Sequence, residues 1–373
     1  MIELQPQIEI RKMQQGEEKT VLRVMRRAFP FFMQLFFSKV MIKSSELVMV
    51  ACVEDEIKAG IILKTFDLPG DGKAGVVDWV FTDPSGRGLG LGAKLMDASM
   101  DWFEGAGCEH FFAIVEGFNT NSSNLFARRG FSILSFREQV QRFGFPGFLK
   151  VWLKTLHLFD LGHFLWGKPA QTRPDSASAQ LGWVLLLNVA IALLARLRLS
   201  GTASGWESLV FLPLWVLILL VLRIALMLVS ARKQGLEVRF RLWETGFLIS
   251  FIVSIIYGAF IPIPGSFYPN ENVWHYHKLK PKFGKAALVG FLPAYVVTLA
   301  LFIAGRLLDF SAGLDAFLAA GFGTAFVFSV MDLVPVFPLV SYNGRRIWDW
   351  KPWVWGILTG VFVIMWGLMI LGI

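Results

Sequence analysis

The chain has 373 residues, of which 55% are hydrophobic and only 17% are charged, with 14 Trp and 35 Phe. This composition is far from that of an average soluble protein, and the length indicates at least two domains. The formal net charge of +8 fits basic loops at a membrane surface better than a basic nucleic-acid face, so we expect no nucleic-acid partner.

Residues 1–140 hold most of the acidic groups and are typical of a soluble domain. Enrichment in β-branched and aromatic residues predicts a strand at 75–82, and a helical pattern follows at 90–105.

A glycine-rich segment, 82–92, joins the strand at 75–82 to the helix at 90–105. Its glycines at 86, 88, 90 and 92 let the backbone come close to a ligand. The first amides of a helix have no partner within the helix, and its dipole favours an anion. The segment therefore predicts a diphosphate site, with a plain strand-to-helix connection as the alternative.

Two motifs in this order resemble the GNAT acetyltransferases. Arg87-x-x-Gly90-x-Gly92 is similar to the family's coenzyme A loop, and the stretch from Asn119 to Phe131 is similar to its Asn-x-x-Ala-x-x-Leu-Tyr-x-x-x-Gly-Phe ending. The resemblance implies an α/β fold with a mixed, splayed central sheet, with strands at 8–11 and 110–116, paired helices within 16–38 and a hairpin of 47–51 and 57–66. It also implies acetyl-CoA as co-substrate and acetyl transfer to an amine. We expect that amine to belong to a membrane-proximal protein, a lipid headgroup or a small molecule.

The resemblance also implies which residues hold the coenzyme A thioester. An amide within Val80, Phe81 or Thr82 would hold the thioester carbonyl in the gap between the splayed strands, and Asn119 would contact the pantetheine arm. Loop amides would hold the pyrophosphate. The loop residues concerned are Arg87, Gly88, Leu89, Gly90, Leu91 and Gly92. The family's tyrosine, which can protonate the thiolate, falls at Phe126, and phenylalanine has no proton to give.

Two carboxylates are candidates for the general base that amine acylation needs. Asp78 falls where the family often has a carboxylate on the fourth strand, and Glu116 lies on the facing strand at the mouth of the gap. Each can instead be an ordinary strand-end carboxylate, with a water chain taking the proton. Because Phe126 removes the family's acid, a non-catalytic acyl-CoA sensor or scaffold remains the alternative function.

Residues 141–180 are expected to connect this domain to a membrane domain. Lysines and aromatics over 143–159 predict an amphipathic helix that lies on the bilayer surface, with a packed core helix as the alternative. The polar Pro/Ser-containing stretch 168–178 predicts a linker.

Residues 181–373 are predicted to form a polytopic membrane domain. Its runs long enough to cross a ~30 Å hydrocarbon core as helices are 181–199, 207–230, 286–308, 312–336 and 353–372. A sixth run, 245–263, ends in two prolines and a glycine, which favours a re-entrant hairpin rather than a full span.

Positive charge predicts the orientation of this domain. If the sixth run returns to its starting side, most loop cations share one face: Arg232, Lys233, Arg239, Arg241, Lys278, Lys280, Lys282, Lys285, Arg345, Arg346 and Lys351. The other face keeps only Arg196, Arg198 and Arg306. The positive-inside rule then places the rich face, and the N-terminal domain with it, in the cytoplasm.

Motifs across 205–352 resemble the site-2 protease family of intramembrane zinc proteases. They are the segment 232–243, the turn Pro262-x-Pro264-Gly265-Ser266, the stretch Gly284–Gly290 and the segment from Asp332 to Trp348. The family's His-Glu-x-x-His motif falls on 223–227, where no side chain suits zinc, and its aspartate falls on Val340 or Asn343. We therefore expect a pseudoprotease domain without metal, with a possible membrane-protein partner.

Buried charges in a membrane are usually paired, so Arg223 and Asp332 are expected either to pair or to face lipid headgroups. The histidines at 157, 163, 275 and 277 are expected to be structural, the last two on an extended strand, since no Cys or Glu stands at ligand spacing. Cys52 and Cys108 are expected to be free, buried thiols.

Overall fold

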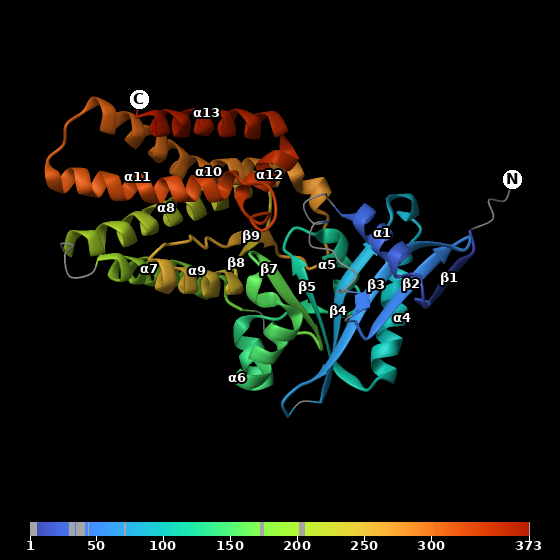
Figure 1. Ribbon diagram of the computed structural model, residues 1–373. Helices are drawn as coiled ribbons and strands as arrows, with labels where there is room; N and C mark the ends of the chain where they lie inside the picture. Colours follow the sequence, from blue (N-terminus) through green and yellow to red (C-terminus); the bar gives the residue numbers. More distant parts are fainter. Residues whose placement is uncertain are drawn as a thin grey trace. The chain divides into compact units, whose positions relative to one another are not determined.

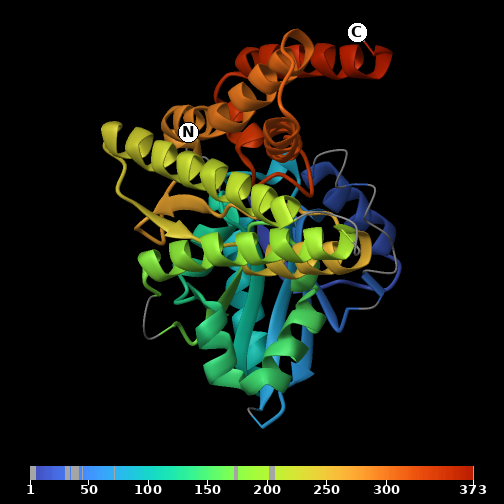
Figure 2. The ribbon, with the colours of Figure 1, turned by 90° about the vertical axis from the view of Figure 1, so that its left-hand side faces the viewer.

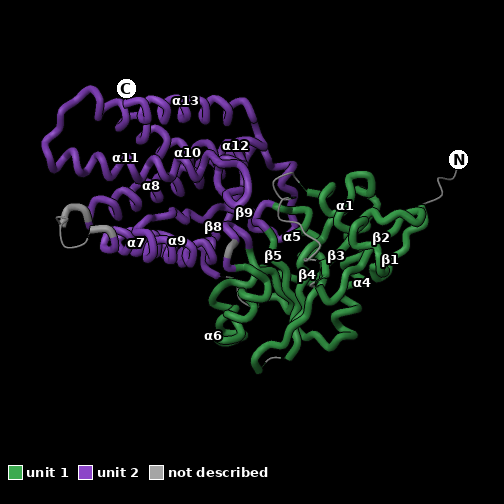
Figure 3. The backbone as a smooth tube through the Cα atoms, viewed as in Figure 1, with its two compact units in different colours: residues 1–115, 119–157, 164–174 green, residues 116–118, 158–163, 175–373 purple. Residues whose placement is uncertain are grey.

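The computed structural model (Figure 1) describes residues 6–29, 34, 42–43, 45–70, 72–171, 175–200 and 206–372. The chain divides into two compact units (Figure 3). The first contains residues 1–115, 119–157 and 164–174, and the second contains residues 116–118, 158–163 and 175–373. These boundaries differ from the expected ones at 140 and 180, because most of 141–174 is part of the first unit.

The first unit is organised by a mixed sheet that has seven strands within the described residues, in the order β1-β2-β3-β4-β5-β7-β6. Its strands are β1 Ile8–Lys12, β2 Leu47–Val53, β3 Glu56–Asp67, β4 Lys73–Thr82, β5 Cys108–Glu116, β6 Ser132–Ile133 and β7 His163–Lys168. Strands β1 to β4 pair antiparallel, whereas β4 and β5 pair parallel. The predicted strands are therefore present, and β6 and β7 are additional.

Helices cover both faces of this sheet. The helices are α1 Glu18–Ala28, α4 Leu91–Gly105, α5 Thr120–Ala127 and α6 Phe136–Thr155, with short 3-10 turns η1 Pro84–Gly86 and η2 His157–Phe159. Helix α1 packs on Val48 and Val50 of β2, whereas Ser99 of α4 contacts Met49 between them. Because side chains alternate along a strand, α1 and α4 lie on opposite faces. The second helix expected within 16–38 falls largely outside the described residues.

One face of helix α6 packs in the core of the first unit, whereas Phe145, Leu149 and Leu153 of the same helix are exposed. Phe143 and Val151 are buried with Phe112 of β5 in one cluster. The helix bends at Gly144, which has a φ of 63°. Strand β7, inside the expected interfacial and linker region, joins the sheet next to β5. Most of 141–171 therefore belongs to the first unit, with 158–163 in the second, and a membrane-surface role for this segment stays a prediction.

The second unit is helical, with one small hairpin. Its helices are α7 Ala177–Ser200, α8 Trp206–Lys233, α9 Glu244–Tyr257, α10 Tyr276–Leu307, α11 Ala312–Leu333, α12 Asn343–Trp350 and α13 Pro352–Leu371. Among the described residues, five of these are long and apolar enough to cross a membrane: α7, α8, α10, α11 and α13. They correspond to the five predicted runs.

The sixth apolar run returns to its starting side, as predicted. Strand β8 (Val238–Arg241) precedes α9, β9 (Ser266–Pro269) follows it, and the two pair antiparallel with Arg241 opposite Ser266. Both ends of the intervening segment therefore meet. Helix α9 has only 14 residues, which is too short to cross a bilayer, and it runs alongside α7 (Figure 2).

The non-helical return from α9 has its backbone satisfied by side chains. Asn188 of α7 donates to the Ile263 carbonyl oxygen at 2.8 Å and accepts from the Ile263 amide at 2.9 Å. Ser250 donates to the carbonyl oxygen of Ile261 at 2.7 Å. Irregular backbone at membrane depth is tolerated only when its polar groups are met inside the protein, and these contacts provide that.

Candidate functional site

Strands β4 and β5 pair at one end and separate at the other. Their parallel pairing runs from Lys73 opposite Cys108 to Val77 opposite Ala113, and β4 continues to Thr82 with partners on β3. The register on β3 skips Asp78, which makes a bulge at the point of separation. A bulge bends its strand and increases its twist, so it accounts for the predicted splay.

The ladder between β3 and β4 fixes which amides of β4 face the gap. The Asp83 amide donates to the Lys58 carbonyl oxygen on the β3 side at 2.7 Å. Amide directions alternate along an antiparallel strand, so Phe81 also faces β3, while Val80 and Thr82 direct their N–H groups toward the side that β5 has left. Of the three predicted residues, the geometry therefore favours Val80 and Thr82.

The glycine loop presents consecutive backbone donors at the start of α4. Gly88 and Gly90 have φ of 87° and 71°, values that glycine adopts without strain. Among the described residues, none accepts a hydrogen bond from the amides of residues 88–92, whereas the Ala93 and Lys94 amides both donate to the Gly90 carbonyl oxygen. Such a row of amides at a helix N-terminus is chemically suited to an anion.

Asp83 fixes the entry to this loop. Its carboxylate accepts hydrogen bonds from the Ser85 amide at 2.9 Å and the Ser85 hydroxyl at 2.7 Å. Arg27 of α1 lies 3.7 Å from the same carboxylate. The bonds from Ser85, with the nearby positive charge of Arg27, lower the pKa of Asp83. The loop therefore begins from a buried, hydrogen-bonded anion.

The candidate base Asp78 is not free. Its carboxylate forms an ion pair with the Lys64 ammonium of β3, and the Asp78 side chain is 17% exposed. To take a proton from an amine, Asp78 would have to separate from Lys64 or share it. Asp78 therefore lies at the bulge beside the gap, with its charge offset by Lys64.

Two further predicted residues lie on α5. The Asn119 side chain accepts from the Ser122 amide at 3.3 Å and so caps this helix. Phe126 is 3% exposed and packs edge to face against Phe131, with ring centroids 5.3 Å apart. Phe126 is a core ring here, and it supplies no proton donor.

The second candidate base, Glu116, is engaged by residues that are distant in sequence. Its carboxylate accepts from the Phe118 amide at 2.9 Å and from the Ser341 hydroxyl at 2.9 Å. The Arg346 guanidinium lies 3.7 Å away. All four residues belong to the second unit. Arg346 was expected to be a loop charge, and its partner Glu116 is evident only from the fold.

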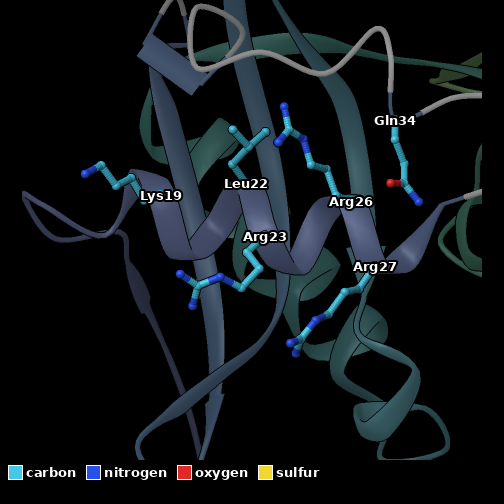
Figure 4. A pocket seen from close by; sticks show the side chains of 6 residues that line it. All are labelled: Lys19, Leu22, Arg23, Arg26, Arg27 and Gln34. Atoms are coloured by element: carbon cyan, nitrogen blue, oxygen red, sulfur yellow. The ribbon is translucent and has the colours of Figure 1, made fainter. Parts of the chain in front are cut away.

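A basic face on α1 was not predicted. A hollow of about 390 Å³ lies beside this helix (Figure 4). It is lined by Lys19, Leu22, Arg23, Arg26, Arg27 and Gln34. Figure 4 shows Arg23 and Arg27 on one side of the helix and Arg26 on the other. The spacing of Arg23 and Arg27, one helical turn apart, is the signal that could have found this face.

In the second unit, Arg223, Met227 and Asn343, at or near positions that the protease resemblance assigns to its zinc motifs, form a buried polar cluster with Asp332. Arg223 of α8 forms an ion pair with Asp332 of α11, and both are buried. Asp332 also accepts from the Asn343 amide at 3.2 Å and its Nδ2 at 3.3 Å, and Nδ2 lies 3.9 Å from the Met227 sulfur. The predicted pairing of Arg223 with Asp332 is confirmed.

The described residues contain no group of three or more His, Cys, Asp or Glu side chains arranged to hold a metal. His275 and His277 begin helix α10 rather than lie on the expected extended strand. Cys52 and Cys108 are free and buried, as predicted, and burial raises the pKa of both thiols.

Comparison with known proteins identifies the first unit. The acetyltransferase (GNAT) family matches residues 17–131. Residues 17–131 form a GNAT domain. The splayed strands and the glycine loop at the start of α4 belong to this domain, whose fold agrees with the predicted one. The match covers less than half of the chain, so it describes the domain rather than the whole protein.

One curated relative carries the name of a protease rather than of an acetyltransferase. A protein of Methanocaldococcus jannaschii, provisionally named as a zinc metalloprotease, is 28% identical over 137 residues. The match covers 34% of this chain and 63% of the relative, so it leaves out more than a third of that protein. Together with the five apolar helices, it fits a membrane domain that resembles a protease.

The solved structures similar to part of this chain include two acetyltransferases of low identity. An acetyltransferase of Brucella melitensis with acetyl-CoA is 18% identical, with 34% of this chain and 83% of that one covered and a TM-score of 0.28. The ribosomal-protein-S18-alanine N-acetyltransferase of Escherichia coli is 18% identical, with 35% and 80% covered and a TM-score of 0.29.

Proposed function

We propose that this chain is a membrane-anchored N-acyltransferase that uses acetyl-CoA. Its acceptor would be an amine of a membrane-proximal protein, a lipid headgroup or a small molecule. The observation that carries the proposal is the row of amides at 88–92, which have no described acceptor and lie at the start of α4. The row follows directly from the strand that separates from β5.

The site fits a coenzyme A thioester in two respects. A β-carbon placed at Gly88 or Gly90 would meet nothing within 4 Å, so the loop leaves room beside these residues for a pyrophosphate to approach the backbone. The Val80 and Thr82 amides can hold the thioester carbonyl, and the same donors stabilise the oxyanion that forms when an amine attacks. Holding both reactants in place supplies much of the rate by itself.

Proton transfer is the weaker part of the site. Asp78 can serve as base if an incoming ammonium displaces Lys64 or if a water relays the proton. Glu116 already accepts two hydrogen bonds and lies beside Arg346, which favours an anchoring role for it. Phe126 offers no proton to the thiolate, so the departing coenzyme A would be protonated by solvent.

For the topology, we propose that the basic loops of the second unit and the GNAT domain lie in the cytoplasm, where acetyl-CoA is. The charge bias between loops supports this orientation. Arg346 is 3% exposed and beside Glu116, so it does not contribute to that bias. Reporter fusions at the C-terminal end and within the segment between α7 and α8 would test the orientation.

A second function, a non-catalytic sensor, is favoured by two observations. Phe126 has replaced the acid, and Asp78 is paired with Lys64. In that case acyl-CoA binding would bias a pseudoprotease domain that holds a membrane-protein partner. Both functions need the glycine loop, and only the first needs a base.

The experiment that separates them is calorimetric titration of acetyl-CoA into the full chain in detergent, with release of free thiol followed in membrane extract. A transferase binds and releases thiol, and Asp78→Asn then lowers turnover by about 100-fold, as for loss of a general base, with unchanged affinity for coenzyme A. Binding without thiol release would support the sensor. No binding would contradict both.

A further inference from the structure

Three residues that connect β5 to α5 belong to the second unit. Glu116, Gly117 and Phe118 follow the strand that faces the thioester gap and precede Asn119, the cap of α5. The Gly117 amide donates to the Gly162 carbonyl oxygen at 3.1 Å. Gly117 also lies so close to the Tyr268 ring that no β-carbon would fit there. The connection is therefore tightly held.

The Phe118 ring is enclosed by aromatic side chains and by one cation. Its neighbours, with centroids 4.7 to 6.0 Å away, are Tyr268, Trp274, Tyr276 and Phe283. The Arg346 guanidinium carbon lies 4.0 Å from the centre of the Phe118 ring. A guanidinium stacked on an aromatic face away from water is attracted strongly, and the planar group suits this stacking better than an ammonium.

Arg346 depends on this segment for its charge balance. It is 3% exposed, it donates to the Val340 carbonyl oxygen, and its Nη1 lies 3.7 Å from the Glu116 carboxylate. The Ser341 hydroxyl donates to that carboxylate at 2.9 Å. Burial and the negative charge of Glu116 raise the pKa of the neighbouring Tyr268. A buried cation and anion hold each other in place, because removing one leaves the other uncompensated.

We propose that Arg346 and Ser341 are positioning residues for acyl transfer. By holding Glu116 and Phe118, they fix where β5 ends and where α5 begins, the two elements that the proposed site needs around the thioester and the pantetheine arm. The kinetic part of this inference rests on the proposed function. It assigns Glu116 an anchoring role in place of a catalytic one.

The test compares Arg346→Met, Ser341→Ala, Glu116→Gln and the double variant Glu116→Gln/Arg346→Met in the full chain. Arg345→Met is the matched control, since Arg345 is the neighbouring arginine and pairs with Asp349 on its own helix at 3.0 Å. We expect Arg346→Met and Glu116→Gln to lower kcat/KM by a similar factor of about 10, and the double variant by no more than either, because coupled residues are not additive. Arg345→Met should match the wild type.

A catalytic Glu116 gives another pattern. Glu116→Gln would then lower kcat far more than Arg346→Met and remove one limb of the pH–rate profile, and this result would overturn the proposal. Additive losses in the double variant would also overturn it. Arg346→Lys, which keeps the charge but not the planar stack, should recover only part of the loss.

Hydrogen exchange separates failure of this inference from failure of the proposed function. Even if the wild type transfers no acetyl group, Arg346→Met should raise exchange at residues 116–127 and leave the glycine loop at 86–92 unchanged. Ser341→Ala should do so more weakly, and it guards against a variant that fails to fold. Unchanged exchange at 116–127 in folded Arg346→Met would overturn the inference.

Discussion

The glycine loop and the buried cluster around Arg223 differ in whether their polar groups have partners inside the protein. In the loop, the amides of residues 88–92 have no acceptor among the described residues, and the space beside the α-carbons of Gly88 and Gly90 is open. In the cluster, the charge of Arg223 is met by Asp332, which Asn343 also contacts. A row of backbone donors at a helix N-terminus suits a ligand, whereas a buried charge paired inside the fold suits a structural role, even though Nε and Nη2 of Arg223 have no partner among the described residues.

The largest expected effect is on stability and comes from breaking the buried ion pair of Arg223 and Asp332. Asp332→Ala leaves Arg223 buried without its anion, and we expect it to lower the free energy of unfolding by about 3–5 kcal/mol. The measurement is thermal unfolding in detergent. The matched control is Arg223→Met/Asp332→Leu, which removes both charges and should be nearly neutral. Equal losses in the single and double variants would contradict the structural reading of the pair.

The next effect comes from filling the open loop. Gly90→Glu forces a side chain into a left-handed conformation and puts a carboxylate among the amides, so affinity for acetyl-CoA should fall by about 100-fold. Gly105→Glu, at the exposed other end of α4, is the control and should bind as the wild type does. Calorimetry measures both. Equal affinity of Gly90→Glu and the wild type would mean that the loop is only a connection.

Asp83 sharpens the comparison because it is a satisfied anion next to unsatisfied donors. Asp83→Ala removes the acceptor for both Ser85 bonds and should cost about 1 kcal/mol of stability, as loss of a helix cap does. The pKa of Asp83 is lowered in the folded state, so its contribution is present above the unfolded value of about 3.9 and is lost as pH falls through the folded value.

The melting temperatures of wild type and Asp83→Ala should therefore differ most near neutral pH. The difference should shrink at the lowest pH at which the protein stays folded. Ser85→Ala, which keeps the carboxylate and removes only the hydroxyl donor, is the control with a smaller effect. A difference that grows on acidification would contradict the assignment of these bonds.

The smallest effect is expected from the basic face of α1. Arg23→Glu/Arg27→Glu should weaken acetyl-CoA binding about threefold at low salt, because exposed charges act at a distance only when they are not screened, and the effect should vanish at high salt. Lys150→Glu/Lys154→Glu, with the same spacing on α6, is the control. A salt-independent loss would indicate a direct contact instead.

Much of the GNAT domain could be predicted because its signals are local. The strands are short runs rich in β-branched and aromatic residues, and the loop combines glycines with a following helix in a few residues. The five membrane helices are equally local, since length and hydropathy suffice to find them. The pairing of Arg223 with Asp332 was foreseen as one of two options, because the cost of an isolated charge in a membrane leaves few alternatives.

The parts that were missed depend on distant residues. Strand β7 is a six-residue segment whose pairing with β6 and β5 decides its structure. The face of α6 with Phe143 and Val151 is buried because it packs on the sheet. The environment of Glu116 was out of reach for the same reason, since Ser341 lies 225 residues away in the chain. A residue pattern predicts whether a segment is a helix or a strand, but it does not predict which distant residues pack against that segment.

The interleaved sequence of the two units limits how this protein can be divided. Glu116–Phe118 and residues 158–163 lie within the first part of the chain but pack in the second unit. A fragment that stops before α7 would expose Phe118 and Leu161 to water and leave Glu116 without Ser341. A fragment cut before α7 would therefore lack the partners of Glu116 and Phe118 and would be a poor proxy for the full chain in assays.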